Sequence, residues 1–190
     1  MVTVVGLADP LSQRQWFVAG LAASYLSCLT FTTISLAGCA EDNSGVDILF
    51  ADDGTQLSAA DKKAITTLLE AAFPLSTDGL RFEHPDCGDV MPVTDVVDLN
   101  GDDNYEVFVT WGNACTSGMT GRSLSLFIAD ASGDYHQSLG FPALGWTVLE
   151  SREESWPDLS FGGPGFCHAV WTWHENGYEF KCNLAETEGG

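Results

Sequence analysis

Apolar spacing predicts one amphipathic helix in the first half of the chain. The segment begins at Ser58, and Asp61 stands three residues later, which is a variant of the capping box. The apolar positions that follow lie three and four residues apart, on one helical face, at Ile65, Leu68, Leu69 and Ala72. Pro74 cannot continue a helix, so the pattern predicts a helix between Ser58 and Pro74.

Short alternating runs predict strands in most of the remaining chain. Residues 46–50 are a strand candidate that stops at the turn signal Asp52-Asp53-Gly54. Beyond residue 80, the segments 104–135 and 156–178 look like two copies of one unit of strands separated by Gly-containing turns. Two copies are too few to close a propeller. We therefore predict a mainly β fold of antiparallel β-meander repeats, as a twisted sheet, sandwich or partial-propeller-like arrangement, with one N-terminal amphipathic helix.

The N-terminal segment has the character of an export signal. Residues 15–38 are apolar or small and carry no charge, which by length could span a bilayer. The run ends in Leu36-Ala37-Gly38-Cys39, which resembles the bacterial lipobox, where a lipoprotein signal peptidase cuts before a lipidated cysteine. The alternative is an uncut signal anchor.

The lipobox resemblance implies a domain organisation and a location. Residues 1–38 would be the signal peptide, 39–45 a tether lipidated at Cys39, and 46–190 a single β-rich domain. The protein would then lie in the bacterial cell envelope. Because no aspartate follows Cys39 directly, the resemblance favours the periplasmic face of the outer membrane.

Four cysteines remain in the predicted domain: Cys87, Cys115, Cys167 and Cys182. Four cysteines in an exported domain predict two disulfides with three possible pairings. We favour Cys87–Cys115 and Cys167–Cys182, since each closes around one strand-rich segment. No CxxC spacing occurs, which argues against a zinc site.

The charge of the chain is strongly negative. There are 27 acidic and 7 basic residues, which gives a net charge of −20. Such a surface repels nucleic acid and anionic lipid and attracts cationic partners. The alternative is that acidity only keeps an exported protein soluble.

The segment 98–106 has the pattern of a calcium loop. Calcium takes about six to eight oxygen ligands, and the predicted ligands are the side chains of Asp98, Asn100, Asp102 and Glu106 and the backbone carbonyl of Asn104. It is not an EF-hand, because the twelfth position is Val109. The loop resembles the calcium loop of FG-GAP and VCBS-type repeats, which occur in integrin-like propellers and secreted bacterial proteins. An acidic turn without an ion is the alternative.

A broader resemblance suggests a partner. The lipoprotein leader, calcium-type loop, two meanders and paired cysteines together are similar to periplasmic immunity lipoproteins, relatives of the invertebrate-type lysozyme inhibitors. Those inhibitors insert a loop with a Ser-Gly…Tyr pattern into a glycosidase cleft, and Ser132, Gly133 and Tyr135 are the matching residues here. Ser-Gly-Asp is also ordinary hairpin chemistry. Gly163 and Phe166 belong to a second loop predicted to contact a partner.

The sequence contains no recognisable catalytic set. It has no nucleophile elbow, HExxH or phosphate-binding glycine loop. Cys167 and His168 are neighbours on a predicted strand, so their side chains would point to opposite faces. We therefore expect a binding protein that captures a cationic protein such as a peptidoglycan hydrolase. The alternatives are a calcium-stabilised structural or adhesion module and a hydrolase that uses His168 or His174.

Overall fold

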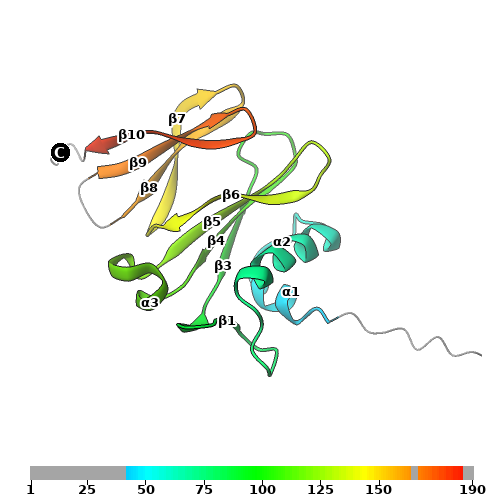
Figure 1. Ribbon diagram of the computed structural model, residues 1–190. Coiled ribbons are helices and arrows are strands. Elements are labelled where there is room, and N and C mark those ends of the chain that lie inside the picture. Colours follow the sequence, from blue (N-terminus) through cyan, green and yellow to red (C-terminus); the bar gives the residue numbers. More distant parts are fainter. Residues whose placement is uncertain (1–41, 164–166, 186–190) are drawn as a thin grey trace, which may run out of the picture. The chain divides into compact units, whose positions relative to one another are not determined.

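The computed structural model describes residues 42–163 and 167–185, which form a mainly β fold (Figure 1). The helices are α1 (Ser44–Leu49), α2 (Ala59–Ala72), α3 (Ala114–Ser117) and a 3-10 turn (Gly118–Thr120). The strands are β1 (Phe82–His84), β2 (Gly88–Val90), β3 (Val93–Val97), β4 (Glu106–Trp111), β5 (Ser123–Ala129), β6 (Tyr135–Pro142), β7 (Gly145–Glu153), β8 (Trp156–Gly162), β9 (Cys167–His174) and β10 (Gly177–Ala185).

Two four-stranded antiparallel meanders make up most of the fold. One sheet has the order β3-β4-β5-β6 and the other the order β10-β9-β8-β7, while β1 and β2 form a separate hairpin. The segments predicted to be copies correspond to β4–β6 and β8–β10. The prediction of antiparallel meander repeats with an N-terminal helix is confirmed.

The sheet β3–β6 is the middle of three layers. Helices α1 and α2 cover one face, and the sheet β7–β10 covers the other (Figure 1). Alternation along β4 produces this arrangement, because Val107 and Val109 join the core under the helices while Phe108 joins the core between the sheets. Phe108 stacks there on Trp146 with ring centroids 3.9 Å apart.

Helix α2 begins as the sequence predicts. Ser58 Oγ accepts a hydrogen bond from the Asp61 N–H at 3.2 Å, and Asp61 Oδ2 accepts one from the Ser58 N–H at 3.1 Å. These reciprocal bonds satisfy donors that the first helical turn leaves free. Ile65 and Leu69 are buried as predicted, whereas Leu68 is 37 % exposed.

The prediction of a strand at 46–50 is wrong, because this segment is helix α1. Val46, Leu49 and Phe50 are spaced three and four residues apart and all pack on the core beneath α2. An apolar run of this length fits a helix or a strand equally well. Helix α1 also starts at Ser44, inside the predicted tether, so the folded part begins before residue 46.

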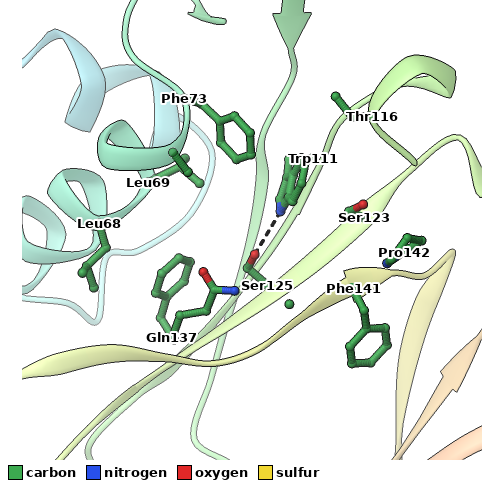
Figure 2. Close-up of a pocket in the computed structure, with 13 residues that line it drawn as sticks. Leu68, Leu69, Phe73, Trp111, Thr116, Ser123, Ser125, Gln137, Phe141 and Pro142 are labelled. Atoms are coloured by element: carbon green, nitrogen blue, oxygen red, sulfur yellow. Dashed lines mark hydrogen bonds between the residues drawn. The ribbon is translucent and has the colours of Figure 1, made fainter. Parts of the chain in front are cut away.

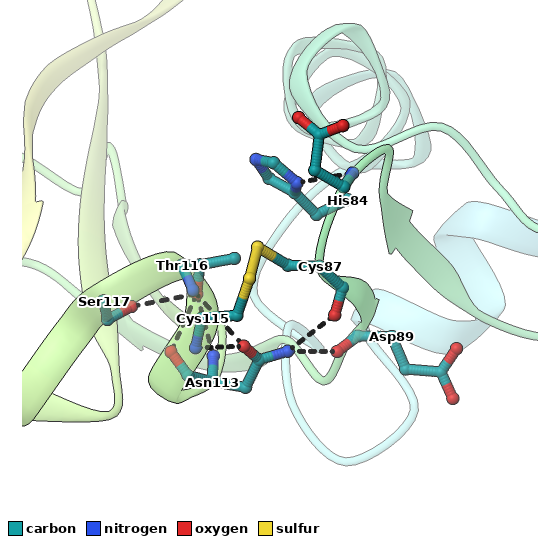
Figure 3. Close-up of a disulfide and its surroundings, with 8 residues drawn as sticks. His84, Cys87, Asp89, Asn113, Cys115, Thr116 and Ser117 are labelled. Atoms are coloured by element: carbon teal, nitrogen blue, oxygen red, sulfur yellow. Dashed lines mark hydrogen bonds between the residues drawn. A yellow bond between two sulfur atoms is a disulfide. The ribbon is translucent and has the colours of Figure 1, made fainter.

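The disulfide Cys87–Cys115 is confirmed. It joins the β1–β2 hairpin to α3, as Figure 3 shows. The Asn113 side chain strengthens this connection by donating to the backbone carbonyls of Cys87 and Asp89 at 3.2 and 3.1 Å. The same side chain caps α3 by accepting from the Cys115 N–H at 2.8 Å.

The predicted disulfide Cys167–Cys182 is wrong, because Cys182 carries a free, exposed thiol. The strands β9 and β10 pair Cys167 with Ala185 and Cys182 with Val170. At roughly 3.3 Å per residue, three positions along a strand place the two cysteine backbones beyond the reach of a disulfide.

The predicted signal peptide and lipidated Cys39 lie outside the described residues. Within the described part of the chain, none of the helices has the length and apolar character needed to span a bilayer.

Candidate partner-binding site at the loop end

Four turns meet at one end of the two sheets and surround a cavity of about 370 Å³. They are the turns 98–105 and 130–134 of the sheet β3–β6, and the turns 154–155 and 175–176 of the sheet β7–β10. We call this region the loop end. The cavity is lined by Asn100, Asp102, Ile128, Ala129, Asp130, Ala131, His136, Ser155, Trp156, Trp173 and Asn176.

The turn 98–105 folds around the Asp98 carboxylate. Its Oδ1 accepts hydrogen bonds from the N–H groups of Gly101 and Asp102 at 2.7 and 3.2 Å, and its Oδ2 accepts one from the Asp103 N–H at 3.2 Å. The left-handed backbone of Gly101, with φ of 81°, lets the chain curl tightly enough for these bonds. Asp98 therefore fixes the shape of the turn.

Asn100, Asp102 and Asn104 add a second set of contacts to this turn. The Asn100 Nδ2 donates to Asp102 Oδ2 at 2.9 Å, and the Asn104 N–H donates to Asp102 Oδ1 at 2.8 Å. Burial opposes ionisation of Asp102, but the contacts from Asn104 and Asn100 outweigh it and lower its pKa. The Asp102 side chain thus faces the cavity as a carboxylate at neutral pH.

Glu106 lies below the turn, at the start of β4, and is only 2 % exposed. Its Oε2 accepts a hydrogen bond from the Leu99 N–H at 2.7 Å. Burial is the main cause that raises the pKa of Glu106 to about 7. The hydrogen bond from Leu99 opposes this shift, and the neighbouring charges of Asp102 and Asp98 add to it.

The fold brings the predicted calcium ligands into one region. The turn contains Asp98, Asn100 and Asp102. Glu106 is close enough for the negative charges of both aspartates to raise its pKa. Such oxygens suit a hard cation, which would also relieve the carboxylate repulsion. Across the part of the chain that the structure describes, no group of three or more His, Cys, Asp or Glu has metal-binding geometry. Calcium binding stays a prediction.

The turn 130–134 is a compact hairpin connection. Asp130 Oδ1 accepts hydrogen bonds from the N–H groups of Ser132 and Asp134 at 2.7 and 3.1 Å. Both bonds lower the pKa of Asp130, and the bond from Asp134 has the larger effect. Ser132 and Gly133 lie exposed at the tip.

Tyr135 differs from Ser132 and Gly133 because it points inward. Its hydroxyl donates to the Tyr105 carbonyl at 2.7 Å, and its ring packs against the core beneath the helices. Burial, with smaller contributions from Asp61 and Glu106, raises the pKa of Tyr135 to about 12. Tyr135 therefore ties the two turns of this sheet together.

The second predicted partner loop does not lie at the loop end. Gly163 follows β8 at the end of that strand opposite to Trp156, and Phe166 lies outside the described residues. Ser132 and Gly163 are therefore at opposite ends of the sheets.

Two stacked indoles form the aromatic wall of the cavity. The rings of Trp156 and Trp173 are nearly parallel, with centroids 3.9 Å apart, and Tyr178 meets both edge-on. The Tyr178 hydroxyl donates to the Pro157 carbonyl at 2.9 Å, which fixes the ring behind this wall. Trp156 remains partly exposed.

The loop end has a strong charge imbalance. Its four turns contain no lysine or arginine, and their acidic residues are Asp98, Asp102, Asp103, Asp130, Asp134, Glu154 and Glu175. Arg152, near the end of β7, donates to the Ser155 carbonyl at 3.1 Å. The arrangement can attract and hold a cation.

A second cavity of about 350 Å³ lies between α2 and the strands β4–β6 (Figure 2). Its wall is largely apolar and includes Leu69 and Phe73 from the helix side and Trp111 from β4. The Trp111 Nε1–H donates to Ser125 Oγ at 3.0 Å. Among the residues that the structure describes, no charged side chain lines this cavity, so it offers less to a cationic partner than the loop end does.

The histidines of the hydrolase alternative lie on β9. His174 is exposed and lies 3.8 Å from Glu179 Oε1. Among the described residues it hydrogen-bonds no serine, threonine or cysteine that could act as a nucleophile. His168 lies opposite Leu184 of β10.

Comparisons with protein families, with curated proteins and with solved structures found no match to this chain.

Proposed function

We propose that this chain is a lipid-anchored binding protein of the bacterial cell envelope. We propose that its partner is a cationic lysozyme-like hydrolase, which it blocks as an inhibitor or immunity protein. The observation that supports the proposal is the loop end, where acidic turns from two sheets surround one cavity. The lipobox-like segment 36–39 supports the anchor.

The negative charge of the loop end is available to a partner. Elsewhere, Arg81 lies 3.4 Å from Asp78 and 3.2 Å from Asp89, and Lys181 lies 2.7 Å from Asp158. These pairs neutralise acidic side chains outside the loop end. At the loop end the acidic residues outnumber Arg152 and His136, the basic residues that lie there. Such an excess of negative charge around a cavity raises the association rate of a cationic protein and disfavours anionic partners.

The backbone of the turns is also held in place by internal hydrogen bonds before a partner binds. Asp98 and Asp130 each hold their own turn through several backbone N–H groups. A surface that is ordered before binding loses less conformational entropy when the partner arrives.

An assay of peptidoglycan lysis tests the proposal. The full chain is mixed at low salt with a panel of cationic lysozyme-like hydrolases that includes any effector encoded beside its gene. We expect one hydrolase to lose its lytic activity in a saturable way. Undiminished lysis across the panel would exclude the inhibitor function.

The second candidate is a calcium-stabilised structural or adhesion module of the envelope. Glu106 favours it, because a buried carboxylate beside Asp98 and Asp102 is costly to ionise without a cation. In this case calcium would stabilise the folded state through binding linkage. The module would bind envelope components and leave lysis unchanged.

A further inference from the structure

Resting on the proposed function, we infer that the cavity of the loop end receives the guanidinium group of an arginine side chain from the captured protein. The guanidinium lies against the partly exposed indole of Trp156, which is itself stacked on Trp173, and pairs with the carboxylates of Asp102 and Asp130.

The size of the cavity fits one side chain. Its volume of about 370 Å³ is near the lower end of the range of ligand pockets. The walls come from both sheets, with Asp102 and Asp130 on one side and Ser155 and Asn176 on the other. An extended side chain can therefore enter from the rim, between the turns.

The aromatic wall distinguishes this cavity from a simple acidic patch. Trp156 and Trp173 both line it, and their stacking holds the indoles in fixed positions. A cation within about 6 Å of an indole face is attracted by the ring quadrupole, and the attraction grows as water is excluded. Carboxylates and indoles in one cavity select a ligand that is both charged and flat.

Arginine meets this requirement better than lysine. Its guanidinium is planar, stays charged at every physiological pH, stacks on aromatic faces and pairs with carboxylates through two parallel hydrogen bonds. The lysine ammonium is a compact and strongly hydrated charge. We therefore expect the cavity to prefer arginine when both are offered.

Indole NMR signals of the full chain test this inference. The probe is N-acetyl-arginine amide, and N-acetyl-citrulline amide is its neutral isostere. We expect arginine amide to shift the Nε1–H signals of Trp156 and Trp173 in a saturable way. The Trp111 signal serves as an internal control, because its Nε1–H is bonded to Ser125 on the helix side of the sheet. Citrulline amide should shift none of them.

Charge variants provide the matched comparison. Asp102→Asn with Asp130→Asn keeps an acceptor oxygen for each turn. We expect it to weaken arginine amide binding by about tenfold, as the loss of two solvent-screened ion pairs implies. Glu70→Gln with Asp86→Asn removes the same charge away from the loop end and should leave binding within about twofold of the wild type. Ser155→Arg, an exposed turn substitution, should also abolish binding by filling the cavity from its rim.

The outcomes separate this inference from the proposed function. Equal shifts with arginine and citrulline amides, or no saturable shift at Trp156 and Trp173, would overturn the arginine site even if a hydrolase is inhibited. Specific arginine binding without inhibition of any hydrolase would support the site and reject the proposed inhibitor.

Discussion

The ionisation of Glu106 makes the free energy of unfolding depend on pH. This residue is buried at the start of β4, and its neighbours Asp98 and Asp102 are also carboxylates. Its pKa of about 7 lies above the ordinary value of 4.5, so the folded state holds the proton more tightly than the unfolded state does. Stability from this group is therefore fully present below about pH 4.5 and is lost as pH rises through 7.

Replacing Glu106 with glutamine should remove this pH dependence. The raised pKa corresponds to a loss of about 2.5 kcal/mol in the free energy of unfolding between pH 5 and pH 8. Glutamine can still accept from the Leu99 N–H, so the variant should gain stability relative to the wild type as pH rises. Urea unfolding in EDTA at several pH values measures the difference, with the exposed Asp103→Asn as the control.

Calcium provides a second arm of the same experiment. If the turn binds calcium, the ion should raise the unfolding midpoint of the wild type at pH 8 and have a smaller effect on Glu106→Gln. A gap between wild type and Glu106→Gln that stays constant from pH 5 to pH 8 would contradict the assignment of Glu106. An unchanged midpoint with calcium or EDTA would leave the segment an ordinary acidic turn.

The disulfide Cys87–Cys115 is the main covalent constraint among the described elements, since it joins the β1–β2 hairpin to α3. The two cysteines are 28 residues apart in the sequence, so the disulfide closes a loop of that length. For a loop of this length, the restricted entropy of the unfolded chain corresponds to about 3–4 kcal/mol of stability.

Cysteine substitutions should have unequal effects on stability. We expect Cys87→Ser with Cys115→Ser to lower the free energy of unfolding by that amount, and Cys182→Ser to leave it unchanged, because Cys182 is free and exposed. Urea unfolding measures both. Equal destabilisation by the two changes would mean that Cys182 takes part in a structural bond.

Local chemistry made some elements predictable. The helix after Ser58 follows from a capping box and an apolar face, and both are properties of a few neighbouring residues. The meanders follow from short strands with glycine-containing turns. Segment 46–50 was not predictable, because its helix depends on packing beneath α2.

Longer-range features could not be read from the sequence. The position of Cys182 depends on the β10 register, which shifts between Phe180 and Cys182 at a bulge. The cavity was missed because its walls are separated in sequence, with Asp102 and Asp130 in turns of one sheet and Trp156 and Trp173 in strands of the other. The acidic turn and the tryptophans were visible separately, but only the packing of the two sheets brings them together.

At the scale of the whole molecule, charge and layering give one consistent picture. The middle sheet has helices on one face and the second sheet on the other. The turns at the ends of the strands therefore stay accessible. The acidic residues of these turns surround the cavity, while the cations Arg81 and Lys181 pair with acids elsewhere. The loop end is therefore where we expect a cationic protein to bind.

The salt dependence of binding to a cationic lysozyme-like hydrolase tests this claim most directly. Calorimetry with the full chain should show that affinity falls at least tenfold between about 0.05 and 0.5 M salt, as screening shortens the reach of the charges. The Asp102→Asn, Asp130→Asn variant should bind more weakly than the wild type, and the Glu70→Gln, Asp86→Asn variant should match it. Absent binding, or binding that is insensitive to salt and equal in both variants, would contradict the account.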